Sequence, residues 1–299
     1  ASGTLHKGLL LSLIILIPTF FLGRFFCGWI CPLGTLNHWA SGVKSERKER
    51  KGKRLLESNR YKPYQRIKYY ILFFLLGAAL LGSLQAGLLD PLPLLARSLG
   101  TAVLPTLHTG ALAMTEAARN TGIGPLETAA NGLYDVLDVA VLPFRQAHFQ
   151  GVLLIGLLFG GILVLNRVFT RFWCRGLCPL GALLGVSSRF AIFGLEKDKE
   201  ACGGCNKCLI FCQGGDNPIV GQKWHQPECH LCLNCQASCP DGALHFRFFP
   251  KQEDTRENPA GTQKVDVTRR KVLASVVGGA AAIPLLRSGN AFEAKHSSL

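Results

Sequence analysis

A repeated cysteine motif constrains this chain more than any other feature of its sequence. Residues 24–34 read Arg-Phe-Phe-Cys-Gly-Trp-Ile-Cys-Pro-Leu-Gly, and residues 171–181 read Arg-Phe-Trp-Cys-Arg-Gly-Leu-Cys-Pro-Leu-Gly. Both copies follow an apolar run, and they lie too far apart in the sequence for the period of a solenoid. The repeat therefore predicts two equivalent corners of the fold, each offering two thiols. They are named here corner 1 and corner 2.

The composition favours a membrane protein over an ordinary soluble domain. Hydrophobic residues make up 48% of the 299 residues and charged residues only 17%. The apolar residues also cluster in blocks, as membrane-spanning helices require. A net charge of +14 would suggest nucleic acid in a soluble protein. Because the basic residues gather in particular loops, membrane topology explains them better, and no nucleic-acid partner is expected.

Three apolar runs predict helices that cross the membrane, each of which needs about 20 residues. They extend from Gly8 to near Cys27, from Tyr69 to Leu89 and from Gly151 to Leu165. The basic loop 44–68 is predicted on the cytoplasmic side, and the sparsely charged segment 90–149 is predicted outside, as short helices. Both corners consequently fall on the cytoplasmic face.

The C-terminal part resembles an export signal. Arg269-Arg270-Lys271 precedes the apolar run Val272–Leu286, which is short for a span, and small residues follow at 288–291. This pattern is typical of a twin-arginine signal, although an ordinary final span is an alternative. Either interpretation places the end of the chain in the periplasm. We also expect the native chain to extend beyond residues 1 and 299.

The twelve cysteines fall into four groups, which indicate metal ligation. Disulfide frameworks belong mainly to small secreted domains, so they do not suit an apolar chain of this length. The groups are Cys27 and Cys31; Cys174 and Cys178; Cys202, Cys205, Cys208 and Cys212; and Cys229, Cys232, Cys235 and Cys239.

The two quartets have the spacing of bacterial four-iron ferredoxins. The second is followed by Pro240, as is usual, whereas Gln213 follows the first. Zinc sites usually use separated Cys-x-x-Cys pairs, so the unbroken quartets favour iron–sulfur clusters. In two-cluster ferredoxins the fourth cysteine of each quartet serves the other cluster. Cluster A is therefore assigned to Cys202, Cys205, Cys208 and Cys239, and cluster B to Cys229, Cys232, Cys235 and Cys212.

The two corners together predict a third [4Fe–4S] cluster. One Cys-x-x-x-Cys pair cannot hold four irons, but two pairs on one face supply the four thiolates required. The ligands of this shared cluster would be Cys27, Cys31, Cys174 and Cys178. Buried unreactive cysteines and a thiol-redox or metal-relay role are the alternatives. Pro32 and Pro179 are expected to begin the helices that follow.

Charged and aromatic residues beside the cysteines have several interpretations. Arg24 and Arg171 are predicted to snorkel where helices leave the bilayer, with charge balance for an anionic cluster as the alternative. His225 and His230 flank the loop of cluster B, at the surface or behind the ligands. The apolar runs contain no histidine, so no haem site is indicated. Candidates for a quinone pocket are Trp29, Trp173 and Asp90, although the tryptophans also suit interface anchors.

These motifs, in this order, resemble the NapH-type membrane ferredoxins of periplasmic nitrate reductase systems and, more broadly, the NosR-like polyferredoxin family. The resemblance covers about residues 1–250 and is carried by both corners and both quartets. It implies quinol oxidation, passage of electrons toward a periplasmic acceptor, and one more span before Ala1. The signal-like end resembles the start of MauM/NapG-type periplasmic ferredoxins, which would make the chain the membrane half of a fusion.

The predicted fold is a mainly α membrane protein. It is a multi-span helical bundle with a cytoplasmic two-cluster ferredoxin domain of the bacterial α+β type and a C-terminal signal-like helix. The alternation at 243–248 predicts one of its strands. The predicted domains are a transmembrane domain at 1–194, the ferredoxin domain at 195–250, a linker with the twin-arginine-like motif at 251–271, and a signal-like or spanning helix at 272–299.

The predicted function is electron transfer in the bacterial cytoplasmic membrane. Three [4Fe–4S] clusters on the cytoplasmic side would pass electrons between the quinol pool and a redox partner in a multi-subunit respiratory complex, with lipid around the spans. The alternatives are an accessory reductase for metal-site assembly, resembling the CcoG-type cytochrome oxidase assembly factors, and a redox sensor. No catalytic side chain is identified.

Overall fold

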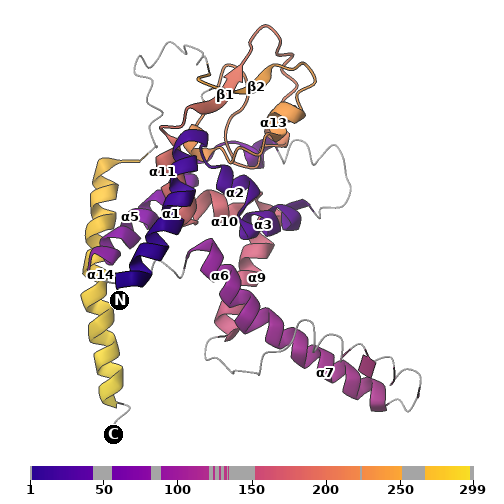
Figure 1. The fold of residues 1–299 in the computed structure, drawn as a ribbon, viewed down its shortest axis with the longest axis vertical. Helices are drawn as coiled ribbons and strands as arrows, with labels where there is room; N and C mark the ends of the chain where they lie inside the picture. Colours follow the sequence, from indigo (N-terminus) through magenta and orange to yellow (C-terminus); the bar gives the residue numbers. More distant parts are fainter. Residues whose placement is uncertain are drawn as a thin grey trace. The chain divides into compact units, whose positions relative to one another are not determined.

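The chain divides into two compact units (Figure 1). The computed structural model describes residues 2–42, 56–81, 89–120, 152–222, 224–250 and 267–296, together with residues 124, 128, 131, 132 and 134. Unit 1 comprises Ala1–Pro91 and Leu165–Leu299, and unit 2 comprises Leu92–Val164. Residues 44–55 of the predicted basic loop and the 251–266 part of the predicted linker lie outside the described residues. The four predicted domains stay a prediction.

Helices form most of the described part of unit 1. They are α1 (Ser2–Leu22), α2 (Phe25–Trp29), α3 (Pro32–Gly42), η1 (Pro63–Arg66), α5 (Ile67–Leu80), α10 (Phe172–Gly176), α11 (Pro179–Ser188), α12 (Lys207–Ile210), η4 (Gln226–Glu228), α13 (Asn234–Ala237) and α14 (Arg269–His296). Pro32 and Pro179 begin α3 and α11, which confirms the prediction, because proline lacks the N–H that the first helical position cannot use.

A two-stranded sheet frames the two cysteine quartets. Strand β1 (Phe193–Lys197) pairs antiparallel with β2 (Leu244–Phe248), and Leu195 lies opposite Phe246. The predicted strand at 243–248 is therefore confirmed. Leu195 and Leu244 pack with Cys235 in a buried cluster. Because both quartets lie in sequence between the two strands, pairing of the strands brings the quartets together.

The predicted multi-span bundle is wrong. No helix that the structure describes is both long enough and apolar enough to cross a membrane. Helix α5 has 14 residues and α9 (Val152–Val168) has 17, which correspond to about 21 and 26 Å against the roughly 30 Å of hydrocarbon in a bilayer. The predicted multi-pass topology, including the periplasmic C-terminus, is therefore not supported by the described helices.

A break in the backbone divides the first apolar run. Helix α1 stops at Leu22 because the chain turns at Gly23, whose φ of +93° is strained for residues with a side chain. The first apolar run therefore does not reach Cys27 as one helix. Helix α14 has 28 residues, but its basic beginning and its polar end from Arg287 onward leave a shorter apolar middle.

Helix α14 packs along α5 through a close backbone approach (Figure 1). A Cβ added at Gly77 would overlap the carbonyl oxygen of Val276, and one added at Gly279 would overlap that of Phe74. The other face of α5 places Tyr69 and Leu72 in a buried cluster with Ala182 of α11. Helix α5 thus joins the C-terminal helix to the corner 2 region.

Unit 2 is helical in its described part. It contains most of α6 (Pro91–Arg97), the π-helical turn η3 (Ser98–Val103), α7 (Leu104–Asn120) and the first part of α9. The segment is helical as predicted, but α6, η3 and α7 follow one another directly from Pro91 to Asn120 and form a longer run than the short helices expected. The rest of segment 90–149, from residue 121 onward, lies mostly outside the described residues.

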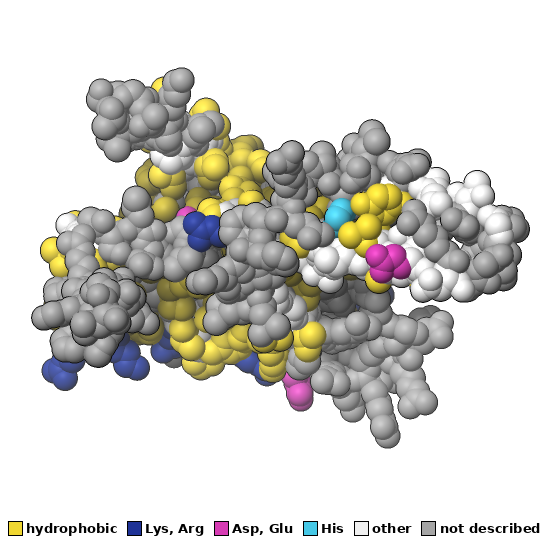
Figure 2. All heavy atoms as spheres, turned by 90° about the horizontal axis from the view of Figure 1, so that it is seen from below, with side chains coloured by type: hydrophobic (Ala, Val, Ile, Leu, Met, Phe, Trp, Pro, Cys, Tyr) yellow, Lys and Arg dark blue, Asp and Glu magenta, His cyan; other side chains and the backbone are white. Residues whose placement is uncertain are grey.

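Many large apolar side chains are exposed on the described part of the chain. Figure 2 shows hydrophobic side chains spread over a broad part of one face. Soluble monomers rarely expose contiguous apolar patches of more than a few hundred Å². Those on the helices of unit 1 include Leu10, Leu13, Ile14, Ile17, Phe20 and Phe21 of α1, Ile67, Phe74, Leu76 and Leu80 of α5, and Leu273 and Val277 of α14.

Two neighbouring glycines of α14 provide a test of its packing. Gly279→Ala would force a methyl group into the backbone of α5, which should cost about 1–3 kcal/mol of unfolding free energy. Gly278→Ala is the matched control, because its methyl group would lie 4.0 Å from the Phe74 ring and alanine favours helix. Denaturant unfolding should separate the two variants; equal midpoints would contradict the α5–α14 contact.

Candidate metal centres

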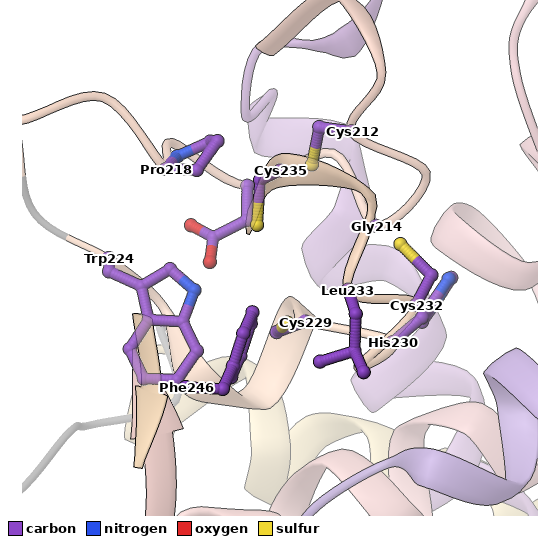
Figure 3. Close-up of a pocket in the computed structure, with 11 residues that line it drawn as sticks. Cys212, Gly214, Pro218, Trp224, Cys229, His230, Cys232, Leu233, Cys235 and Phe246 are labelled. Atoms are coloured by element: carbon purple, nitrogen blue, oxygen red, sulfur yellow. The ribbon is translucent and has the colours of Figure 1, made fainter. Parts of the chain in front are cut away.

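One cavity gathers four cysteines from both quartets (Figure 3). Cys212 of the first quartet lines it with Cys229, Cys232 and Cys235 of the second. Trp224 and Phe246 close its apolar side. The empty space at this cavity, including the part that opens to solvent, is about 340 Å³, and its cysteines are those assigned to cluster B.

A second cavity gathers the remaining quartet cysteines. Cys202, Cys205 and Cys208 line it together with Cys239 of the second quartet. Its volume of about 360 Å³ is close to that of the first cavity. Burial raises the pKa of Cys208, and the nearby Cys205, Cys202 and Cys239 raise it further. These four are the cysteines assigned to cluster A, so each cavity is lined by three cysteines of one quartet and the fourth of the other.

Left-handed backbone conformations curl the cysteine loops around the cavities. Asn206, Leu231 and Leu233 have φ values of 58°, 49° and 59°. The backbone N–H of Leu231 donates to Cys229 Sγ at 3.4 Å, and that of Ala243 donates to Cys239 Sγ at 3.3 Å. Hydrogen bonds to ligand sulfurs tune the potential of an iron–sulfur cluster. The loops therefore suit thiolates that carry negative charge.

Corner 1 and corner 2 bring four further thiols together. Cys27 and Cys174 lie in the short helices α2 and α10, and Cys31 and Cys178 directly precede the prolines that begin α3 and α11. Burial raises the pKa of Cys31 to about 11, and Cys174 and Cys27 raise it too. Burial also raises the pKa of Cys178, as do Cys174 and Cys27. All four thiols are buried, and each lies within electrostatic reach of others in the set.

Polar donors reach two of these sulfurs. Asn37 Nδ2 donates to Cys174 Sγ at 3.6 Å, and the backbone N–H of Gly181 donates to Cys178 Sγ at 3.2 Å. Asn37 Oδ1 in turn accepts from Asn166 Nδ2 at 2.6 Å. The sequence did not identify either asparagine, because each lies outside the motifs and is brought to the corners by the fold.

The chemistry of the donor sets suits a cluster better than one ion. Among the described residues, no three His, Cys, Asp or Glu side chains converge on a point that could hold a single metal ion. A zinc ion needs thiolates about 2.3 Å from one centre, whereas a four-iron cluster distributes its thiolates over separate irons. Three sets of four cysteines, all with free thiols, supply the ligands that such clusters require.

Both corners contact the loops of cluster B. Trp29 Nε1 of corner 1 donates to the carbonyl oxygen of Leu231 at 2.9 Å, and Gly28 packs against the backbone of His230. Arg175 of corner 2 is fully buried and donates to the carbonyl oxygen of Cys212 at 3.0 Å. The corner thiols thus lie on segments that contact the loops carrying the cysteines assigned to cluster B.

A buried ion pair lies between the corners and cluster B. Lys68 of α5 donates to Glu228, the residue before Cys229, and Tyr69 donates to the same carboxylate at 2.8 Å. Arg24 Nη1 lies 3.9 Å from Glu228 and donates to the carbonyl oxygen of Pro227 at 2.8 Å. Burial lowers the pKa of Lys68 to about 8, although Glu228 opposes the shift. The sequence analysis missed this pair because no motif marks it.

The arginines before the corners are buried, so the snorkelling interpretation is wrong. The exposed fractions of Arg24 and Arg171 are 0% and 2%. His230 is also buried, and burial lowers its pKa well below the ordinary value, as do Arg24 and Arg171. His225 lies behind the first cavity, where its ring stacks on Tyr61. Of the predicted quinone candidates, Trp173 is buried and Trp29 is 64% exposed.

A buried carboxylate was also missed at cluster B. Asp216 lines the first cavity, and its Oδ1 accepts from the backbone N–H of His225 at 2.9 Å. Burial raises the pKa of Cys229 well above its ordinary value, and Asp216 raises it further. Metal ligation must therefore displace thiol protons at this site. Its position four residues after Cys212 was the only sequence signal for Asp216.

Comparison with known proteins supports iron–sulfur binding. A family described as a 4Fe-4S binding domain matches residues 5–52 and 151–195, the segments that contain the two corners. The uncharacterized protein MJ0749 of Methanocaldococcus jannaschii is 37% identical over 122 residues, which are 40% of this chain and 48% of that protein.

Longer matches have lower identity. The putative electron transport protein YccM of Escherichia coli is 27% identical over 241 residues, covering 79% of this chain and 55% of that protein. The regulatory protein NosR of Stutzerimonas stutzeri is 29% identical over 212 residues, covering 71% of this chain and 22% of that protein. The chain thus spans about half or less of the length of these relatives. No solved structure matches it.

The exchange of cysteines between quartets can be tested by removing single ligands. Cys212→Ser should remove cluster B and lower the iron content by about four atoms per chain, while cluster A stays. Cys239→Ser is the matched variant, which should remove cluster A and leave cluster B. Iron analysis and EPR spectra of the reduced proteins distinguish the two losses. Loss of the same cluster from both variants would contradict the exchange.

The buried ion pair can be tested by a double-mutant cycle. Glu228→Gln should cost about 3–5 kcal/mol of unfolding free energy, because it leaves the buried Lys68 and Arg24 without their carboxylate. Lys68→Gln should cost less, because Arg24 still faces Glu228. The double variant should cost less than the sum of the single variants. Glu196→Gln is the control, because its pair with the exposed Arg247 should contribute at most about 1 kcal/mol. Additive losses in denaturant unfolding would contradict the coupling.

Proposed function

Because the chain belongs to the NapH- and NosR-like family of 4Fe–4S electron-transfer proteins, we propose that it carries electrons between quinol and a redox protein of a respiratory complex. The proposal assigns it three [4Fe–4S] clusters, two in the thiol-lined cavities and one held jointly by the corners. When bound, the clusters would supply one-electron carriers. The chain holds them, shields them from water and sets the charge around them.

The gathering of the four corner thiols carries this proposal. Cys27, Cys31, Cys174 and Cys178 come from segments far apart in the sequence, yet all are buried and coupled electrostatically. Both segments lie within the match to the 4Fe-4S binding family. Neither corner alone has enough thiolates for four irons, so the shared arrangement explains why the chain contains the motif twice.

Quinol is proposed as the partner at corner 1. Oxidation of a quinol releases a pair of electrons and a pair of protons, and iron–sulfur clusters accept the electrons one at a time. Trp29 and Ile30 lie between the corner 1 cysteines and are 64% and 55% exposed. An exposed aromatic and an aliphatic side chain beside a cluster suit the flat apolar ring of a quinone. Trp173 is too deeply buried to take this role directly.

The protein is proposed to work at the cytoplasmic face of the bacterial inner membrane. Its exposed apolar side chains provide contact with lipid (Figure 2). The net charge of +14 suits the anionic cytoplasmic leaflet. This proposal requires association with the membrane and no crossing of it. Cosedimentation with vesicles that contain anionic lipid, and release by salt or detergent, would measure it.

A second candidate function is redox sensing. One relative, NosR, is described as a regulatory protein. Clusters that report their redox state to a partner would need the same thiol arrangement, but they would not need turnover with quinol. Steady-state oxidation of quinol by the purified protein and an electron acceptor would therefore favour electron transfer over sensing.

Iron content tests the number of clusters. Anaerobically purified protein should contain about twelve irons per chain, and the double variant Cys27→Ser/Cys174→Ser about eight. Cys202→Ser is the control, because it should also lose about four irons while the EPR signal of the corner cluster stays. About eight irons in the unchanged protein, with no loss in the double variant, would remove the shared cluster from the proposal.

Reduction by quinol tests the partner. Menaquinol or ubiquinol analogues should reduce the clusters of the intact protein, as seen by bleaching of their visible absorbance. Trp29→Ala should slow this reaction at least about tenfold, because it removes the exposed ring at corner 1, whereas Trp39→Ala should leave the rate unchanged, because that exposed ring lies on α3 outside the corner. Intact clusters that both quinols leave oxidised would contradict the quinol partner.

A further inference from the structure

Two equivalent arginines of the repeat occupy equivalent buried positions. Arg24 and Arg171 each stand three residues before the first cysteine of their corner. Burying a long cationic side chain is costly unless it is paired. Both are nevertheless almost completely inaccessible to solvent. Anchoring of the corners at a membrane surface would leave the guanidinium groups exposed. The burial of both arginines therefore needs another explanation that applies to both.

Each arginine reaches the opposite corner. Arg171 Nη1 donates to the carbonyl oxygen of Cys27 at 3.2 Å. Arg24 Nη2 lies 2.8 Å from the position that a Cβ of Gly181 would take, beside the turn whose N–H binds Cys178 Sγ. The two contacts are reciprocal, since corner 1 reaches corner 2 through Arg24 and corner 2 reaches corner 1 through Arg171.

The two guanidinium groups retain N–H donors for a further partner. Within the part of the chain that the structure describes, Arg24 Nε and Nη2 and Arg171 Nε are buried without a hydrogen-bond acceptor. His230 Nε2, on the neighbouring loop, is also buried without a hydrogen-bond partner. Native proteins satisfy nearly all such groups. Unpartnered donors of buried cations beside four thiols indicate that an anionic group completes this site.

The local charge balance also requires an anion. Arg24, Lys68, Arg171 and Arg175 are all buried in this region. Among the described residues, the acid in contact with Arg24 and Lys68 is Glu228, so one carboxylate faces two cations. Burial alone would lower the pKa of Arg24, but Cys27, Glu228 and Cys178 raise it above its ordinary value. An iron–sulfur cluster with four thiolate ligands is anionic and would balance the excess positive charge.

We propose that Arg24 and Arg171 form a reciprocal clasp that joins the two corners and directs positive charge at the shared cluster, raising its reduction potential. The inference rests on the proposed shared cluster and deepens it. Reduction adds negative charge to the cluster, and nearby cations stabilise that charge. The arginines therefore act through the cluster as positioning and charge-compensating residues. Exchange of either for a neutral residue would make the shared cluster harder to reduce.

The experiment measures the midpoint potential of the shared cluster in the intact protein by EPR-monitored redox titration. Arg24→Gln and Arg171→Gln should each lower the equilibrium constant for its reduction at least about tenfold, which is 59 mV for one electron. Arg24→Lys and Arg171→Lys keep the charge and should change it less than about threefold. Arg247→Gln is the control, because this arginine is 63% exposed, and it should change nothing.

Signals of clusters A and B report whether each variant has folded. Unchanged potentials in the Gln variants, or equal shifts in the Lys and Gln variants, would overturn the proposal. If neither Gln variant keeps clusters A and B, the Lys variants test the proposal instead. Loss of the iron of the shared cluster from the Lys variants would then contradict the proposal. About eight irons in the protein without substitutions would refute the shared cluster itself. About twelve irons in that protein, together with unaltered midpoint potentials in the Gln variants, would refute only the arginine clasp.

Discussion

The ion pair between Lys68 and Glu228 joins the helical part of unit 1 to the cysteine loops. Lys68 lies on α5, and Glu228 directly precedes Cys229, so the pair fixes the second quartet against the helices. Arg24 adds a third charge at the same carboxylate. Breaking such a buried pair leaves a charge without compensation. The positions of corner 1 and of the second quartet therefore depend on this contact.

Buried positive charge connects the fold with the chemistry. Thiols buried in apolar surroundings resist ionisation, as the raised pKa values of Cys178 and Cys229 indicate. Ligation by iron requires thiolates, so the surroundings must favour negative charge. Arg24 and Arg171 provide this at the corners, and inward-pointing backbone N–H groups provide it at the two cavities. The same groups that are costly to bury thus make an anionic cluster favourable.

The local elements were more predictable than the architecture. Helix starts at Pro32 and Pro179 and the strand at 243–248 followed from short-range sequence rules and are confirmed. The family resemblance is confirmed as well. The multi-span bundle was wrong, because apolar composition does not reveal how long each helix is, and α5 and α9 have only 14 and 17 residues. An apolar run predicts burial or lipid contact, and helix length depends on where the backbone turns.

The sequence by itself determined which cysteines form each candidate ligand set, because the spacing of cysteines along a short loop limits which of them can reach one cluster. The two sets of four cysteines predicted from the quartets are the same sets that line the two cavities. Only the tertiary structure decided which distant groups surround them. Lys68, Asn37 and Asp216 lie outside every motif, and Arg24 and Arg171 changed from expected surface anchors to buried cations. The physical reason is that burial and charge pairing arise from contacts between segments far apart in the chain.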